Sequence, residues 1–172
     1  MQLAEDNLMR QIAAPPAKGG RSGSVIQLAE INMMRQPAAP QAEGGVLLIA
    51  NHVSFIDGVL LLLYLPREPR ILARADASHG RIYRRLALDL GTIFIEPGKR
   101  SLVESLETAR QALQNGEVVC IFPEGKMTTT GDVGEFQRGF LRVVKDSPAP
   151  IVPMYLEGLW GSIFSWEGGK VI

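Results

Sequence analysis

The sequence is poor in the residue types that build disulfides and metal sites, and it carries no net charge. It has one cysteine, Cys120, and two histidines, His52 and His79. A single cysteine excludes an intramolecular disulfide, and so few sulfur and imidazole ligands argue against a zinc site, so no metal is expected. The 18 Lys and Arg residues balance the 18 Asp and Glu residues. A protein that relies on bulk attraction to nucleic acid is therefore not expected.

Long apolar runs and a targeting segment are also missing. The longest uncharged apolar stretch, Gly58 to Pro66, is less than half of the roughly 20 residues that a membrane-spanning helix needs. No basic-then-apolar signal peptide opens the chain. The 172 residues correspond to about one domain. These features predict a soluble, cytoplasmic domain.

The N-terminal region, residues 1–45, contains a near duplication. The segments Gln2–Gly20 and Gln27–Gly45 are near copies, each with a short helix-compatible piece (Gln2–Gln11, Gln27–Gln36), an Ala/Pro run and a Gly pair. Two copies are fewer than the roughly three repeats that a solenoid needs. Two interpretations stay open: a duplicated linker, or short apolar helices that dock on a neighbour or a membrane surface. We therefore divide the chain into this segment and a domain over 46–172.

From Gly45 onward, strand-like and helix-like segments alternate. Short apolar runs predict buried strands, and helical spacing of apolar residues predicts helices. The predicted strands are Val46–Ala50, Ile71–Ala73, Thr92–Ile95, Glu117–Phe122 and Ile151–Leu156. The predicted helices are Asp57–Leu65, Arg81–Leu90, Phe140–Lys145 and one that runs from Ser101 to Asn115-Gly116. This alternation predicts an α/β fold with a largely parallel or mixed sheet flanked by helices.

The helix that Ser101 opens has the clearest pattern. Ser101 and Glu104 have the spacing of a capping box. One apolar stripe follows, formed by Leu102, Leu106, Ala109 and Leu113. Lys99 and Arg100 directly precede the helix, and two cations beside its positive N-terminal end predict a phosphate site.

A polar segment, Asn51 to Asp57, follows the Val46–Ala50 strand, where ligands gather in parallel sheets. Asp57 lies five residues after His52 and can fold back onto one imidazole nitrogen. The other nitrogen is then an acceptor, as a general base requires. The alternative is that His52 caps the next helix, with Asp57 as a first-turn charge. Ser54 lacks a Gly-x-Ser-x-Gly elbow, so we predict a helix cap there rather than a nucleophile.

A second polar loop, Phe122-Pro123-Glu124-Gly125-Lys126, follows the Glu117–Phe122 strand. The proline ends the strand, and Gly125 lets the backbone approach a ligand. Glu124 and Lys126 present opposite charges at the sheet edge. The alternative is a plain surface loop.

In this order, the segments resemble the glycerolipid acyltransferase superfamily, the 1-acylglycerol-3-phosphate and lysophospholipid acyltransferases. The resemblance runs from Gly45 to Lys170 and implies that family's α/β fold. The matching motifs are Asn51-His52-x-Ser54-x-x-Asp57, Gly91-x-x-Phe94-Ile95-Glu96, Phe122-Pro-Glu-Gly125 and Ile151-Val-Pro153. The stretches Ile121–Gly131 and Glu157–Ser162 look closest to acyltransferase modules within bacterial fusions. Those fusions also hold a lysophospholipid-transporter-like part and an acyl–acyl-carrier-protein synthetase.

The resemblance implies transfer of a fatty acyl group from acyl-CoA or acyl-ACP to a hydroxyl of a lysophospholipid or acylglycerol phosphate. His52 would be the general base and Asp57 would orient it. Glu124, Gly125 and Lys126 would bind the acceptor head group, with the Gly125 N–H also helping to hold the oxyanion. The thioester carrier is a substrate, so neither a cofactor nor a metal is implied.

The sequence departs from the family pattern at two cations and at both ends. Pro97 replaces the usual arginine of the second motif, so Lys99 or Arg100 would supply the phosphate contact. Lys126 stands one position earlier than the usual cation. This shift argues against plain glycerol phosphate as the acceptor. The duplicated segment replaces the usual helical lead-in, and the end soon after Trp166 allows an excised or truncated module. A non-catalytic lipid- or acyl-carrier-binding module of the same fold is the alternative function.

The stretch from 67 to 100 is basic, with eight cations against four acids. Beside the apolar Val59–Leu65 run, this surface could sit on the anionic headgroups of a membrane. It would place the protein in the cytoplasm, peripheral to the inner face of the bacterial inner membrane. The same cations could instead receive an acyl carrier protein, and the apolar run could be a core helix.

Overall fold

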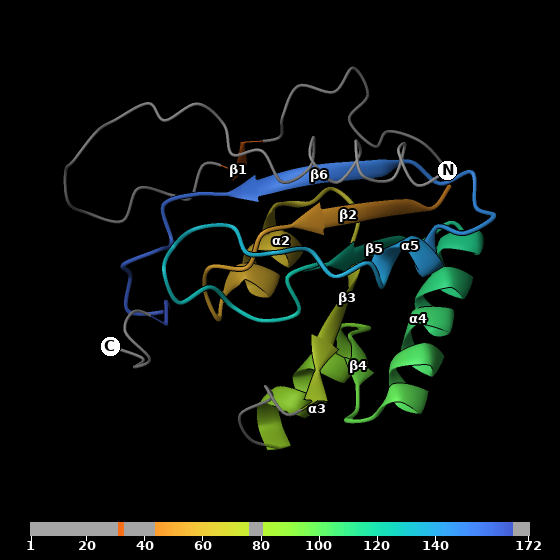
Figure 1. The fold of residues 1–172 in the computed structure, drawn as a ribbon, viewed down its shortest axis with the longest axis horizontal. Coiled ribbons are helices and arrows are strands. Elements are labelled where there is room, and N and C mark those ends of the chain that lie inside the picture. Colours follow the sequence, from red (N-terminus) through yellow and green to blue (C-terminus); the bar gives the residue numbers. More distant parts are fainter. Residues whose placement is uncertain (1–30, 33–43, 76–80, 167–172) are drawn as a thin grey trace.

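One six-stranded sheet organises the chain. A computed structural model describes residues 31–32, 44–75 and 81–166. Among these residues the strand order is β1-β6-β2-β5-β3-β4 (Figure 1). The strands are β1 (Ile31–Asn32), β2 (Val46–Ala50), β3 (Pro69–Arg74), β4 (Ile93–Ile95), β5 (Val118–Ile121) and β6 (Ile151–Leu156). All neighbours pair parallel except β1, which runs antiparallel to β6. The predicted α/β class with a largely parallel sheet is confirmed.

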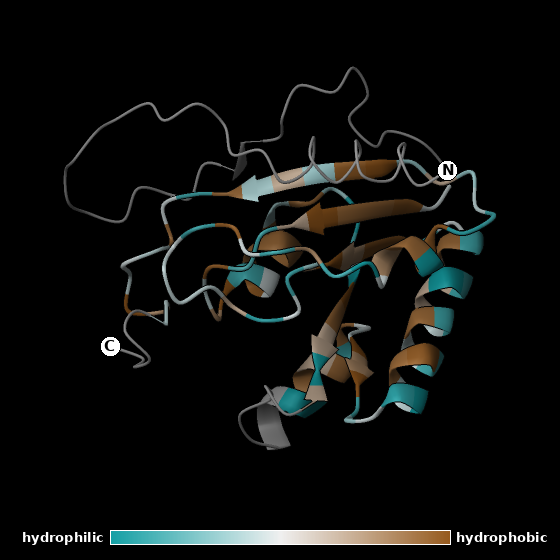
Figure 2. Cartoon of the chain, viewed as in Figure 1, coloured by the Kyte–Doolittle hydropathy of each residue, from teal (hydrophilic) through white to brown (hydrophobic). Residues whose placement is uncertain are grey.

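The helices cover both faces of the sheet. They are α2 (Asp57–Tyr64), α3 (Arg81–Asp89), α4 (Lys99–Gln114) and α5 (Phe140–Val143). On β2, Leu47 and Ile49 pack with the core beneath α4 and α5, whereas Leu48 and Ala50 pack with the core that includes Leu61 of α2. Every β2 side chain is therefore buried. Figure 2 shows the result: β2 is apolar along its whole length, while α4 carries one polar and one apolar face.

Short apolar runs located the strands well. The bounds of β2 and β6 are those predicted, while β4 differs by one residue at its start and β3 and β5 differ by one or two residues at each end. Apolar runs flanked by Gly or Pro mark strands that are buried on both faces. The central strands thus follow from local sequence.

The start of α4 differs from prediction. The helix begins at Lys99, with Gly98 as its N-cap and without a side-chain capping bond. Gly98 has φ of +119°, so the chain turns into the helix at the glycine rather than at Ser101. The Glu104 carboxylate accepts a hydrogen bond from Arg100 at 2.9 Å. The predicted capping box is therefore wrong, and Ser101 lies inside the helix.

The apolar stripe of α4 also needs one correction. Leu106, Ala109 and Leu113 are buried against the sheet, but Leu102 in the first two turns is exposed. Ser105 is buried beside them and donates a hydrogen bond to the Phe94 carbonyl at 3.0 Å. The C-terminal end agrees with prediction, since α4 ends at Gln114, Asn115 is its C-cap and Gly116 has φ of +85°.

Most of the duplicated segment lies outside the described residues. Ile31 and Asn32 form β1, so the helix-compatible piece Gln27–Gln36 is not helical at these two positions. Pairing with the free edge of β6 gives this backbone its strand conformation. His79 also lies outside the described residues. Within them, no helix is both long and apolar enough to cross a bilayer.

Candidate functional site

Two polar loops meet at the carboxyl ends of the central strands. Residues 51–56 follow β2, and residues 122–134 follow β5. The two strands are parallel neighbours, with Leu48 opposite Cys120. Because parallel strands end at the same edge of a sheet, both loops reach that edge side by side. The sequence motifs around His52 and Glu124 are therefore brought together.

His52 and Asp57 form a hydrogen-bonded pair. The His52 Nδ1–H donates to Asp57 Oδ2 at 2.8 Å. Asp57 is fully buried, while 27% of the His52 side chain is exposed. Since the carboxylate is an acceptor, Nδ1 carries the shared proton, and in the neutral imidazole Nε2 keeps its lone pair. The pair therefore has the geometry of a general base and its orienting acid.

The Asp57 carboxylate accepts three further hydrogen bonds from its own turn. Oδ2 accepts the backbone N–H of Val53 at 2.7 Å and that of Ser54 at 3.0 Å. Oδ1 accepts the Ser54 hydroxyl at 2.5 Å. The N-cap of α2 is Ile56, without a side-chain capping bond. The prediction that Ser54 caps the helix is therefore wrong: its hydroxyl fixes the acid instead.

The backbone of His52 is attached to the second loop at two points. Its N–H donates to Glu124 Oε1 at 2.9 Å, and its carbonyl accepts the Thr128 N–H at 2.9 Å. Its ring stacks on Phe122, with centroids 4.4 Å apart. The other Glu124 oxygen accepts the Gly134 N–H at 2.8 Å. The histidine is thus held through its backbone, its ring face and its Nδ1 atom.

Asn51 joins the end of β2 to the end of β6. Its Nδ2 donates to the Leu156 carbonyl at 3.0 Å, and its Oδ1 accepts the Leu156 N–H at 2.6 Å. The side chain is buried and replaces the ladder bonds that stop at Ala50 and Met154. Sequence reasoning did not assign Asn51 a role, because its partner lies 105 positions away.

The segment 158–166 closes over the first loop. The Phe55 N–H donates to the Phe164 carbonyl at 3.0 Å, and Ser54 forms an isolated antiparallel bridge with Ser165. Ser165 is fully buried. This segment therefore supports the turn that holds Asp57 rather than trailing away from the domain.

The structure changes the interpretation of Gly125 and places Lys126. The Gly125 N–H donates to the Phe122 carbonyl at 3.1 Å, in a turn where Gly125 has φ of +68°. The N–H is therefore engaged within its own turn, and its role toward an oxyanion stays a prediction. Lys126 is exposed on the same loop as Glu124, without an ion-pair partner in the described part of the chain. Head-group binding by Glu124, Gly125 and Lys126 stays a prediction.

Lys99 and Arg100 lie at a different part of the sheet. They follow β4, which β5 and β3 separate from β2. Both are exposed, and Arg100 pairs with Glu104 at 2.9 Å. The acid of the second motif, Glu96, pairs with Arg84 of α3 at 2.7 Å. The structure therefore does not join Lys99 or Arg100 to the His52 loop, and their phosphate contact stays a prediction.

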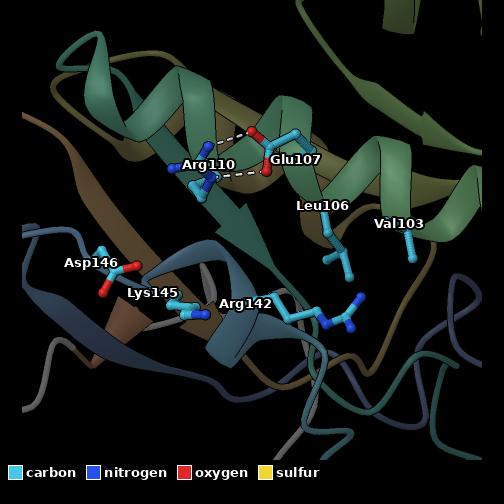
Figure 3. A pocket seen from close by; sticks show the side chains of 7 residues that line it. All are labelled: Val103, Leu106, Glu107, Arg110, Arg142, Lys145 and Asp146. Carbon is cyan, nitrogen blue, oxygen red and sulfur yellow. Dashed lines mark hydrogen bonds and ion pairs between the residues drawn. The ribbon is translucent and has the colours of Figure 1, made fainter.

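A cavity of about 420 Å³ lies between α4 and α5 (Figure 3). It is lined by Val103, Leu106, Glu107, Arg110, Arg142, Lys145 and Asp146. Arg110 makes two hydrogen bonds to Glu107, which holds the pKa of that carboxyl below its usual range. None of the lining residues belongs to the two polar loops, so this cavity is separate from the His52–Asp57 pair.

Cys120 lies under the site on β5. It is fully buried, and burial, with a smaller contribution from the charge of Asp57, raises its pKa from 9.0 to about 12. A thiol in this environment is protonated at neutral pH and inert. Cys120 is thus part of the core, as its apolar flanks predict. The described residues contain no cluster of three side chains suited to a metal ion.

Comparison with known proteins gives consistent matches. A family model described as Acyltransferase matches residues 30–157. A probable 1-acyl-sn-glycerol-3-phosphate acyltransferase of Mycoplasma pneumoniae is 29% identical over 126 residues, which cover 70% of this chain and 47% of that protein. The 1-acyl-sn-glycerol-3-phosphate acyltransferase of Cocos nucifera is 30% identical over 112 residues, 64% of this chain and 36% of that protein. The chain thus spans about half, or less, of these relatives' length.

The fold is similar to that of a solved acyltransferase structure. The crystal structure of the 1-acyl-sn-glycerophosphate (LPA) acyltransferase PlsC from Thermotoga maritima superposes with a TM-score of 0.52 at 24% identity. The match covers 64% of this chain and 43% of that chain. It supports the sheet arrangement described above. The likeness to modules of bacterial fusion proteins stays a prediction.

Proposed function

The chain belongs to the Acyltransferase family, and from that premise we propose that it transfers a fatty acyl group from a thioester to a free hydroxyl of a lysophospholipid or acylglycerol phosphate. The observation that carries the proposal is the His52–Asp57 pair, bonded at 2.8 Å with Nε2 left as an acceptor. The relatives' names support the acceptor class, since they are 1-acyl-sn-glycerol-3-phosphate acyltransferases. The donor is acyl-CoA or acyl-ACP, and no cofactor is required.

The proposed mechanism uses one proton transfer in each direction. The acceptor hydroxyl gives its proton to His52 Nε2 as its oxygen attacks the thioester carbonyl carbon. The Asp57 carboxylate balances the imidazolium that forms. When the tetrahedral intermediate collapses, the carbon–sulfur bond breaks, and Nε2 returns the proton to the leaving thiolate. The products are an ester and a free thiol, and no acyl-enzyme is formed.

The acceptor's phosphate needs a cation near the His52–Asp57 pair. Lys126 is the strongest candidate, because it is exposed on the loop that also binds the His52 backbone. Lys99 and Arg100 follow β4, three positions from β2 in the sheet. At about 4.8 Å per strand, that separation is on the order of 14 Å. We therefore assign these two residues to a more distant part of the acceptor or donor.

Acyl transfer to a panel of lysophospholipids and acylglycerol phosphates, with a radiolabelled thioester as donor, tests the proposal. We expect labelled ester with the wild-type chain and only background label with His52→Ala. Thioester or lipid binding without turnover would instead support the non-catalytic module. Stoichiometric labelling of Ser54 by a covalent serine probe would support an esterase, although the Ser54 hydroxyl is buried and bonded to Asp57.

We also propose that an anionic membrane surface presents the acceptor, with the protein peripheral to the inner face of the bacterial inner membrane. Support comes from the basic segment and from exposed apolar side chains on α2, namely Val59, Leu63 and Tyr64. On α3, Arg85 is largely exposed and pairs only loosely with Asp89 at 3.4 Å. Such surface pairs leave the cations available to lipid headgroups.

Charge reversal on α3 tests the membrane proposal. Arg81→Glu, Arg84→Glu and Arg85→Glu together should weaken binding to vesicles that contain anionic lipid, most strongly at low salt. Reversal of Arg142 and Lys145, two cations that line the α4–α5 cavity, is the control at another face and should bind normally. Equal loss in both sets would show a bulk charge effect. Unchanged binding of the α3 variant would remove this face from the function.

A further inference from the structure

The Glu124 carboxylate is buried and bonded at both ends. Only 5% of the residue is exposed. One oxygen accepts the His52 N–H at 2.9 Å, and the other accepts the Gly134 N–H at 2.8 Å. Hydrogen bonds from backbone N–H groups to an ionised carboxylate are stronger than those between neutral groups. This carboxylate therefore joins the backbones of two loops, and neither oxygen is directed to solvent.

From this arrangement we propose that Glu124 is a positioning residue for His52 rather than a ligand for the acceptor. The inference rests on the proposed function, since it assigns Glu124 a task in the same reaction. Where the His52 backbone sits decides where its Nε2 atom points. Glu124 and Thr128 fix that backbone from one side, while Asp57 fixes the ring from the other.

Electrostatics favour the same assignment. A carboxylate repels the phosphate of a lysophospholipid or acylglycerol phosphate, so burial away from the head group removes an unfavourable interaction. The cation that such a head group requires is available nearby at the exposed Lys126. Glu124 and Lys126 thus have separate tasks: one holds the base, and the other faces solvent.

Gly134 makes the close approach possible. A Cβ atom at this position would lie 2.9 Å from Glu124 Oε2, inside van der Waals contact, and 3.6 Å from its Cδ. Gly134 does not need its conformational freedom, because its φ is not in the left-handed region. An added methyl group would therefore push on the Glu124 carboxylate without changing its charge or any group that faces the substrate.

The test uses three variants of the full chain. Glu124→Gln keeps the shape but replaces one acceptor oxygen with a donor, so the amide can accept from only one of the two N–H groups. Gly134→Ala displaces the carboxylate and leaves it chemically intact. Gly139→Ala is the matched control in the same segment, because its Cβ would make only an ordinary 3.7 Å contact with Leu106 and its backbone is helical.

We expect a separation of kcat from KM. Glu124→Gln and Gly134→Ala should each lower kcat on the order of tenfold to a hundredfold, the scale of a misplaced catalytic group. The KM for the acceptor should stay within about twofold. Without substrate, the ring ¹⁵N signals of His52 should shift in both variants. Gly139→Ala should match the wild type in all three measurements.

Different results would overturn the inference. A raised acceptor KM with an unchanged kcat would place Glu124 on the substrate. Unchanged kcat and His52 signals in folded Gly134→Ala would show that the carboxylate does not hold the histidine. If the wild-type chain transfers no acyl group, the proposed function fails, and the ¹⁵N signals alone still decide whether Glu124 positions His52. If Glu124→Gln does not fold, Gly134→Ala carries the same test.

Discussion

Ser54 donates its hydroxyl hydrogen to Asp57 Oδ1 at 2.5 Å, so the serine of this Ser-His-Asp trio is bonded to the acid and not to the histidine. In a serine hydrolase the nucleophile donates to the histidine Nε2. Here the Asp57 carboxylate lies between the other two groups, because its second oxygen binds His52 Nδ1. Ser54 therefore orients the acid, and in the proposed reaction the attacking oxygen belongs to the acceptor.

The first prediction treats His52 and Asp57 as a unit. His52→Ala should lower kcat by about 10²–10⁴-fold, the usual contribution of a general base. Asp57→Asn should also cost heavily, because an amide can hold the wrong tautomer and cannot balance the imidazolium. The double variant should be little worse than His52→Ala, since nothing remains to be oriented. Steady-state kinetics on the four proteins provide the measurement.

Ser54→Ala separates this mechanism from a purely structural role. It removes one of the hydrogen bonds to a buried carboxylate and should cost about 1–3 kcal/mol of unfolding free energy, with a much smaller loss of rate than His52→Ala. Melting temperatures measured beside kcat distinguish the two effects. Nearly full turnover by folded His52→Ala would end the proposed mechanism.

The second prediction concerns the tie between β2 and β6. Asn51→Asp keeps the shape of the side chain but turns its donor toward the Leu156 carbonyl into an acceptor. The repulsion and the unsatisfied buried group should cost about 1–3 kcal/mol of unfolding free energy, measured by urea denaturation. Asn115→Asp, an amide-to-acid change at an exposed position, should cost about 0.5 kcal/mol. Equal effects would mean that the tie contributes nothing.

The third prediction compares two glycines with similar backbones. Gly131 and Gly158 have φ of +84° and +83°, but a Cβ would meet the Trp160 ring at 2.7 Å only at Gly131. Both alanine variants should lose about 1–2 kcal/mol for the left-handed conformation. Gly131→Ala should lose about 1–3 kcal/mol more through overpacking. Urea denaturation of the pair checks this, and equal losses would show that Trp160 moves aside freely.

The fourth prediction concerns Cys120 and pH. Its pKa of about 12 in the folded chain lies above the ordinary 9.0. The thiol therefore stays protonated in the fold and ionises first in the unfolded chain. As the pH rises from 9 to 12, the free energy of unfolding should fall by at most about 1.4 kcal/mol per unit from this group, and below pH 9 it should not change.

Cys120→Ala serves as the reference for that measurement, because its stability curve should lack this slope. A thiol reagent at pH 8 should leave the native protein unlabelled and react after unfolding. Rapid labelling of the folded chain would contradict the burial of Cys120.

Local sequence predicts the sheet but not the contacts that support the site. The strands β2 and β6 are visible because each is a short apolar run with a turn residue before it. The His52–Asp57 bond was predictable too, since only five positions separate the two residues. Both signals lie within a few residues, where spacing fixes geometry.

The contacts of Glu124 could not be predicted from the spacing of residues in the sequence. Its motif indicates a ligand-binding loop, yet its carboxylate binds the His52 N–H across 72 positions, and this depends on β5 lying beside β2. The start of α4 was predicted wrongly for a local reason: Gly98 has a positive φ, and the chain turns into the helix there, three residues before Ser101. The capping-box spacing was present, but Glu104 pairs with Arg100 instead.

The contacts around His52 join residues that are far apart in the sequence, and this sets the order in which the site can form during synthesis. The His52–Asp57 motif leaves the ribosome before its supports, since Glu124 follows His52 by 72 positions and Leu156 follows Asn51 by 105 positions. Both neighbours of β2, the strands β5 and β6, also come after it in the chain. A growing polypeptide therefore carries His52 and Asp57 before the residue that binds the His52 backbone N–H has been synthesised. For the proposed reaction, we therefore expect His52 to act as a base only after β6 has paired with β2.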